Sequence, residues 1–152
     1  MTPTLFGRWQ TRLFLNAFFG IPTTLLYMLV WDQFAYKPTS ELFWHMPNLL
    51  FYLTVTGLAL DVVYILVQRL RWDRDWPPAF QLGGGALELG VVFGLLYLDV
   101  LPSVDWCDED PVRFPIHYVS MWVPAFFFLF GPMRVLFPRW RFSGGKLIGG
   151  GS

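Results

Sequence analysis

The chain has 152 residues, of which 55% are apolar, 20% aromatic and only 14% charged. Soluble domains carry roughly 45–50% apolar and about 25% charged residues, so this composition excludes a water-soluble globular domain. It also excludes intrinsic disorder, which requires low hydrophobicity. The formal net charge of zero excludes a nucleic-acid footprint. The sequence therefore predicts a small, all-α polytopic membrane protein.

Four stretches are long and apolar enough to cross a bilayer as helices, which takes about 20 residues each. We expect them at Leu13–Trp31, Pro47–Gln68, Ala79–Leu101 and Ile116–Phe137. Pro22 and Pro124 are expected to kink the first and fourth helices, because a proline inside a helix removes a hydrogen bond. The Gly131-Pro132 pair is expected to add a kink to the fourth span rather than to end it.

Lysine and arginine predict the orientation of these spans. Nine of the eleven fall at the N-terminus, in the second loop, or at and beyond the last span, whereas only Lys37 and Arg113 fall in the other two loops. Short cytoplasmic loops carry an excess of these residues, so both termini are expected on the cytoplasmic side. The membrane is expected to be a plasma or inner membrane, or an internal energy-transducing one.

The loops between the spans are short, and this favours a compact arrangement. Short connections make sequential helices antiparallel neighbours, which predicts a four-helix up-down bundle in a single domain over residues 1–142. The remaining segment, residues 143–152 with the sequence SGGKLIGGGS, is rich in glycine. We expect it to be a flexible cytoplasmic tail.

Two carboxyl groups lie well inside predicted spans, Asp61 in the second and Glu88 in the third. Counted from the inner ends of two antiparallel helices, both have a similar depth. Two carboxyl groups in a low dielectric cannot both ionise cheaply, so at least one is expected to be protonated. Three interpretations stay open: structural hydrogen bonding, proton handling, and an ion pair between Asp61 and Arg134.

Polar residues at helical spacing should support this pair. In the second span they are Thr54, Gly57, Asp61, Tyr64 and Gln68, and in the third Gln81, Gly84, Gly85, Glu88 and Asp99. The steps of three and four residues in the second span place its polar residues on one face, which is expected to point into the protein.

The opposite face of the third span is a ladder of small residues, Ala86, Gly90 and Gly94. Small residues at every fourth position let two helix backbones approach closely in a membrane. We therefore expect this ladder to pack against another helix, within the bundle or in a partner.

Metal and cofactor sites have little support in the sequence. His45, His117 and Asp99 lie near the expected outer surface and are of types that bind metals, but they come from separate segments without a spacing motif. We therefore expect no metal and no dedicated cofactor, although a lipid, quinone or pigment would suit the aromatic interior.

Arginine and tryptophan alternate on the expected inner surface. The residues are Arg69, Arg71, Trp72, Arg74 and Trp76 in the second loop, and Arg139, Trp140 and Arg141 after the last span. This pattern is typical of a membrane anchor that contacts anionic headgroups, and it also suits docking to a protein partner.

Three functions remain open from the sequence. The first is a non-enzymatic subunit or scaffold of a larger membrane complex, joined to other subunits or to further copies of itself. The second is a membrane-embedded enzyme or binding protein for a lipid, isoprenoid or quinone, with Asp61 and Glu88 as acid and base. The third is a small oligomeric proton-coupled transporter.

Overall fold

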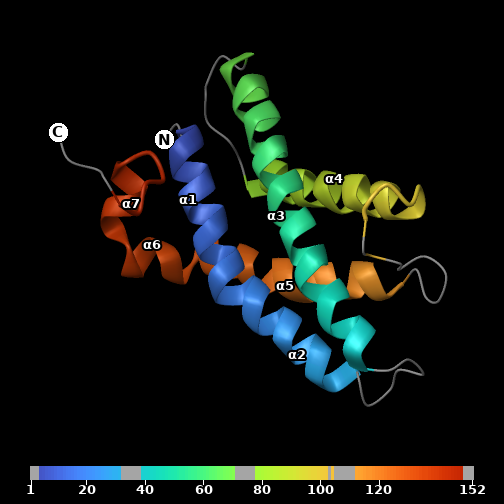
Figure 1. Ribbon diagram of the computed structural model, residues 1–152. Coiled ribbons are helices and arrows are strands. Elements are labelled where there is room, and N and C mark those ends of the chain that lie inside the picture. Colours follow the sequence, from blue (N-terminus) through green and yellow to red (C-terminus); the bar gives the residue numbers. More distant parts are fainter. Residues whose placement is uncertain (1–3, 32–38, 71–77, 103, 105–111, 149–152) are drawn as a thin grey trace.

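The computed structural model describes residues 4–31, 39–70, 78–102, 104 and 112–148. Within these ranges every regular element is a helix (Figure 1). The elements are α1 (Leu5–Leu15), the π-helical turn η1 (Asn16–Gly20), α2 (Ile21–Trp31), α3 (Thr39–Leu70), α4 (Pro78–Tyr97), α5 (Arg113–Phe130), α6 (Pro132–Leu136) and α7 (Pro138–Phe142). The all-α prediction is confirmed for this part of the chain.

Three helical stretches are long and apolar enough to cross a membrane, namely Leu5–Val30, His45–Arg69 and Ala79–Tyr97. They match the first three predicted spans in place. The first helix begins at Leu5 rather than Leu13, because the hydroxyl of Thr4 accepts a hydrogen bond from the backbone N–H of Gly7 at 3.1 Å and caps it. The two arginines that precede the predicted first span therefore belong to its helix.

The expected distortion at Pro22 takes the form of a π-helical turn. The turn, η1, lies just before the proline, and the backbone N–H of Ile21 donates to the carbonyl of Asn16, five residues back. A single π turn widens the helix locally, and it makes room for a residue that cannot take part in the regular ladder. The helix continues beyond it as α2.

The fourth predicted span, Ile116–Phe137, needs correction. Helix α5 ends at Phe130, Gly131 has a non-helical backbone, and α6 starts at Pro132. The Gly-Pro pair therefore ends the helix instead of kinking it, because proline disfavours the α conformation in the residue before it. By contrast, Pro124 lies within α5, which continues past it. The third predicted span is also shorter, since α4 ends at Tyr97.

The helices form two neighbouring pairs (Figure 1). The α1–α2 stretch runs alongside α3, and α4 runs alongside α5, with the two pairs crossing in this view. The described ends of the chain come together, because the backbone N–H of Thr4 donates to the carbonyl of Gly144 at 2.9 Å. Residues 4 and 144 therefore lie at the same end of the molecule.

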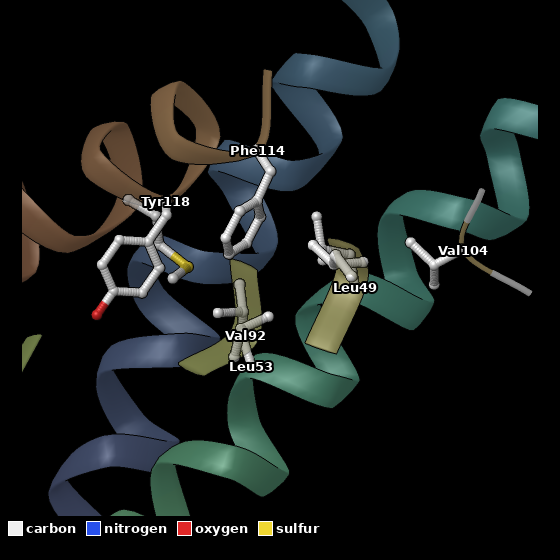
Figure 2. Close-up of a cluster of buried hydrophobic side chains, with 8 residues drawn as sticks. Leu49, Leu53, Val92, Val104, Phe114 and Tyr118 are labelled. Carbon is white, nitrogen blue, oxygen red and sulfur yellow. The ribbon is translucent and has the colours of Figure 1, made fainter. Parts of the chain in front are cut away.

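A cluster of apolar side chains fills the contact among α3, α4 and α5 (Figure 2). The cluster includes Leu53 of α3, Val92 of α4 and Phe114 of α5. Tyr118 turns its hydroxyl out of the cluster and donates it to the carbonyl of Gly85 at 3.0 Å. Dense apolar packing thus holds three helices together on one side of the polar residues described below.

The outward faces of the long helices are also apolar. Leu29, Val63 and Phe127 are among many large side chains that are more than half exposed. Such a continuous apolar surface is rare on a soluble monomer and suits contact with lipid.

Candidate functional site: a buried ionic cluster

Four charged side chains from three helices meet inside the protein. Arg8 and Arg12 come from α1, Asp61 from α3 and Glu88 from α4. We call these four residues the ionic cluster. The two arginines are four residues apart, so successive turns of α1 present them on the same face.

Arg12 is the centre of the cluster because it binds both acids. Its Nη1 atom donates to both carboxylate oxygens of Glu88, at 2.9 and 2.8 Å. Its Nε atom donates to Oδ2 of Asp61 at 2.8 Å, and Nη2 donates to Oδ1 at 3.3 Å. One guanidinium therefore ties α1 to α3 and to α4 at the same time.

Asp61 also binds the second arginine. Nη2 and Nε of Arg8 donate to its Oδ1 atom at 2.7 and 3.1 Å. The Arg8 guanidinium lies over the ring of Tyr64, with Cζ 3.6 Å from the ring centroid, and this position suits a cation–π interaction. Two cations thus stand against two carboxyl groups, and the cluster is neutral when both acids are ionised.

Burial makes these contacts strong. The Asp61 residue is 2% exposed and Glu88 is 4% exposed. Charge-assisted hydrogen bonds are short and strong where water is excluded, whereas an unpaired carboxylate in the same place would be costly. The cluster therefore favours the packing of α1, α3 and α4 in which all four charges are paired.

Gly57 leaves the space that the Arg12 side chain occupies. A β-carbon built at Gly57 would lie 2.1 Å from Nη1 of Arg12 and 2.9 Å from Oε1 of Glu88. No side chain at this position is compatible with the guanidinium where it is. On the polar face predicted for the second span, Gly57 thus contributes by leaving room for the Arg12 guanidinium.

Uncharged polar contacts extend the cluster along the α1–α3 seam. Trp9 donates its indole N–H to the carbonyl of Leu58 at 3.2 Å. The amide of Asn16 donates to the hydroxyl of Thr54 at 2.9 Å, and that hydroxyl donates to the carbonyl of Leu50. This seam is consistent with interhelical hydrogen bonding in an apolar surrounding.

A second polar contact joins α2 to α5. The Thr24 hydroxyl and Nε2 of His117 are 3.1 Å apart, and the Tyr27 and Ser120 hydroxyls are 2.8 Å apart. The His117 side chain is fully buried. It is therefore a hydrogen-bonded interior residue of the described chain.

The structure does not gather the candidate metal ligands. His117 is buried at the α2–α5 contact, whereas Asp99 is exposed and lies in a turn after α4 with a positive φ of 52°. Among the described residues, which include His45, no group of three His, Cys, Asp or Glu side chains could hold a metal ion.

The predicted carboxyl pair does come together, but through partners that the sequence did not suggest. Asp61 and Glu88 meet at Arg12. Arg134, which one of the three interpretations paired with Asp61, is exposed, and its Cζ atom lies 5.1 Å from the ring centroid of Phe130. The interpretation that Asp61 forms an ion pair with Arg134 is therefore wrong, because Asp61 is bound to Arg8 and Arg12. The available signal was the spacing of Arg8 and Arg12, which places both on one helix face next to a polar residue, Asn16.

Other members of the predicted polar faces have different surroundings. Gln68 is buried, and Gln81 is partly buried at the start of α4. A β-carbon at Gly84 would make only ordinary contacts with Tyr64, whereas one at Gly85 would lie 2.4 Å from the indole ring of Trp122. Gly85 is thus the glycine of α4 that permits close packing against α5.

The small-residue ladder of α4 faces outward in this chain. Ala86 and Gly90 are exposed, and a β-carbon at Gly90 or Gly94 would meet no atom within 4 Å. Packing of this ladder against another helix of the described part of the same chain is therefore ruled out. Contact of the ladder with a helix of a partner stays a prediction.

The predicted inner-surface residues are only partly described. Arg71, Trp72, Arg74 and Trp76 lie outside the described residues, as does the side chain of Arg141. Arg69 and Arg139 are exposed. Trp140 is half-buried, and its indole N–H donates to the hydroxyl of Thr11 at 2.8 Å.

Residues 143–148, which the glycine content predicts to be flexible, lie against α1. The Gln10 side chain accepts hydrogen bonds from the backbone N–H groups of Leu147 and Ile148 at 2.8 and 3.3 Å and donates to the carbonyl of Ile148 at 3.2 Å. Close approach is allowed because Gly7 has no β-carbon, which would lie 2.2 Å from the carbonyl oxygen of Gly144. Residues 149–152 of the predicted tail lie outside the described residues.

The chain matches no protein-family model, and no curated protein or solved structure is significantly similar to it. Its function therefore has to be inferred from the geometry of the ionic cluster and of the surfaces around it.

Proposed function

We propose that this protein is a non-enzymatic subunit or scaffold of a membrane complex. The observation that carries the proposal is the pairing of both intramembrane carboxyl groups, Asp61 and Glu88, with Arg12. Acids that are already bound to arginine serve to fix the helices. In this interpretation the ionic cluster is an internal lock that gives a small chain one stable helix arrangement.

The proposed domain is a bundle of four membrane-spanning helices with both termini in the cytoplasm. Three crossings, by α1–α2, α3 and α4, would leave the chain on the side opposite to its start. The hydrogen bond between Thr4 and Gly144 supports a fourth crossing, by α5, because an even number of crossings returns the chain to its starting side. The distribution of lysine and arginine supports a cytoplasmic location for both termini.

The same pairing weighs against the enzyme and the transporter. A general acid or base needs a lone pair or proton within reach of its substrate. Both oxygens of Glu88 and both oxygens of Asp61 already accept hydrogen bonds from arginine. Protonation of either acid would also leave a buried arginine charge without its full counter-charge, which is costly in a buried site.

The outward ladder of α4 is the proposed contact with the rest of the complex. Ala86, Gly90 and Gly94 leave a smooth strip on which the backbone of another transmembrane helix could lie closely. The partner would be another membrane protein or a further copy of this chain.

The experiment is native mass spectrometry of the complex after mild solubilisation from its own membrane. We expect a fixed stoichiometry with a partner, and loss of that partner in Gly90→Leu while the isolated chain keeps its thermal stability. Ala59→Leu is the matched control, because Ala59 is a small, exposed residue on the outside of α3. A wild-type chain that is monomeric in its own membrane, and that acts on a lipid or quinone by itself, would overturn the proposal.

A further inference from the structure

The segment after α5 folds into a compact unit at the end of the molecule where the two described chain ends meet. We call residues 131–148, which comprise α6, α7 and the following turns, the foot. Met133 is fully buried, the rings of Phe137 and Phe14 meet edge to face at 5.6 Å, and Trp140 binds Thr11. The foot is thus fixed to the first two turns of α1 and the residues that follow them.

The outer surface of the foot exposes several large apolar side chains, and their exposure to water would be unfavourable. The exposed fractions are 79% for Val135, 63% for Leu136, 78% for Phe142 and 79% for Ile148. Helices α6 and α7 have five residues each, too few to cross a bilayer. These side chains therefore project from a surface element rather than from a span.

The foot is also strongly basic. Its charged residues are Arg134, Arg139, Arg141 and Lys146, and residues 113–148 contain no acid. Arg134 and Arg139 are exposed. The acids of the ionic cluster cannot neutralise the foot, because Asp61 and Glu88 are buried and bound to Arg8 and Arg12.

From these features we infer that the foot is a binding surface for anionic phospholipid headgroups. Exposed large apolar side chains beside arginines are typical of elements that lie in the membrane interface, with the apolar groups at the acyl boundary and the cations at the phosphates. Guanidinium groups suit phosphate because they donate two parallel hydrogen bonds. The location fits as well, because the foot directly follows α5 and contacts Thr11 and Phe14 near the end of α1.

A bilayer is favoured over a protein partner by the mixture of charge and apolarity on one small element. A protein interface usually has an apolar core with charge at its rim. In the foot, Arg134 directly precedes Val135 and Leu136, and Arg139 lies three residues before Phe142. This alternation suits an element at the surface of a lipid leaflet, where its arginines contact phosphate groups and its apolar side chains contact the acyl chains.

The test compares purified protein in nanodiscs of phosphatidylcholine alone and of phosphatidylcholine mixed with phosphatidylglycerol. Native mass spectrometry counts the lipids that stay bound after release from the disc. We expect the wild type to retain phosphatidylglycerol selectively, and the double variant Arg134→Gln with Arg139→Gln to bind it roughly tenfold more weakly, since each lost charge weakens attraction to an anionic surface. The charge-retaining variant Arg134→Lys with Arg139→Lys should keep most of the binding.

Two further comparisons make the result specific to the foot. Arg69→Gln removes one exposed charge at the end of α3, outside the foot, and it should reduce phosphatidylglycerol retention less than Arg139→Gln does. In the wild type, rising ionic strength should release the bound lipid, which tests the same claim without any variant. Equal retention of both lipids by the wild type, or equal losses in Arg69→Gln and Arg139→Gln, would overturn the inference.

Discussion

The guanidinium of Arg12 lies where a side chain on Gly57 would be. The nearest atom, Nη1, is 2.1 Å from the ideal position of a Gly57 β-carbon, and the same atom donates to both oxygens of Glu88. The pairing of Arg12 on α1 with Glu88 on α4 therefore depends on the absence of a side chain at Gly57 of α3. Its consequences can be tested by stability measurements in detergent or nanodiscs.

The first prediction is that Gly57→Ala destabilises the protein. The new methyl group forces the guanidinium away from two buried acids, and overpacking of this kind typically costs about 1–3 kcal/mol. Thermal unfolding should show a clear loss relative to Gly90→Ala, whose methyl group meets nothing within 4 Å. If Gly57→Ala and Gly90→Ala unfold at the same temperature, Arg12 does not occupy this space.

The second prediction is energetic coupling between Arg12 and Glu88. Arg12→Gln leaves two buried carboxylates without their common partner, and loss of one member of a buried pair costs about 3–5 kcal/mol. Glu88→Gln should cost less, because it keeps a hydrogen-bonding group and removes a charge. A double-mutant cycle should show the double variant to be clearly more stable than the sum of the two single losses predicts. Simple additivity would mean that the two side chains do not interact.

The third prediction concerns the contact of Gly85 with Trp122. The indole ring is rigid, stacks on Phe126 at a centroid distance of 5.1 Å, and lies 2.4 Å from the ideal β-carbon position of Gly85. We expect Gly85→Ala to lower stability by about 1–3 kcal/mol. Gly84→Ala is the matched control on the neighbouring residue, where the added methyl group makes only ordinary contacts with Tyr64. Indistinguishable melting of the two variants would contradict the packing of α4 on α5.

The fourth prediction is that Gln10 holds residues 147–148 on α1. Gln10→Ala removes the side chain that makes three hydrogen bonds to the backbone of this segment. Neutral hydrogen bonds contribute about 0.5–1.5 kcal/mol each, so the segment should detach before the helices unfold. Hydrogen exchange of the Leu147 and Ile148 amides should speed up in the variant and leave α3 unchanged. Fast exchange of these amides in the wild type would show that the tail is flexible, as its glycine content predicts.

The helices could be predicted from the sequence because a bilayer imposes a simple rule. Long apolar stretches identify the first three spans, since lipid-exposed backbone must be hydrogen-bonded within the helix. The ends were less predictable. Thr4 caps α1 well before the apolar stretch begins, and Gly131 ends α5 where hydropathy continues. Local backbone chemistry decides where α1 begins and where α5 ends, and a count of apolar residues contains no information about this chemistry.

The acids of the ionic cluster could be identified from the sequence, but their partners could not. A carboxyl group inside an apolar stretch is conspicuous, so Asp61 and Glu88 stand out. Arg8 and Arg12 lie close to the expected membrane surface, where arginine is common for reasons of topology. Their side chains are long enough to reach inward from that position, and only the three-dimensional path of α1 beside α3 shows that they do.

Both buried acids are predicted to be ionised and bound to arginine, and infrared spectroscopy tests this most directly. A protonated carboxyl group has a carbonyl stretching band that is well separated from the bands of a carboxylate. We predict that neither acid contributes a protonated-carboxyl band in the wild type at neutral pH, so that Asp61→Asn and Glu88→Gln remove no intensity from this region of the spectrum. A protonated-carboxyl band at neutral pH that is lost in either variant would contradict the account and favour a proton-handling pair.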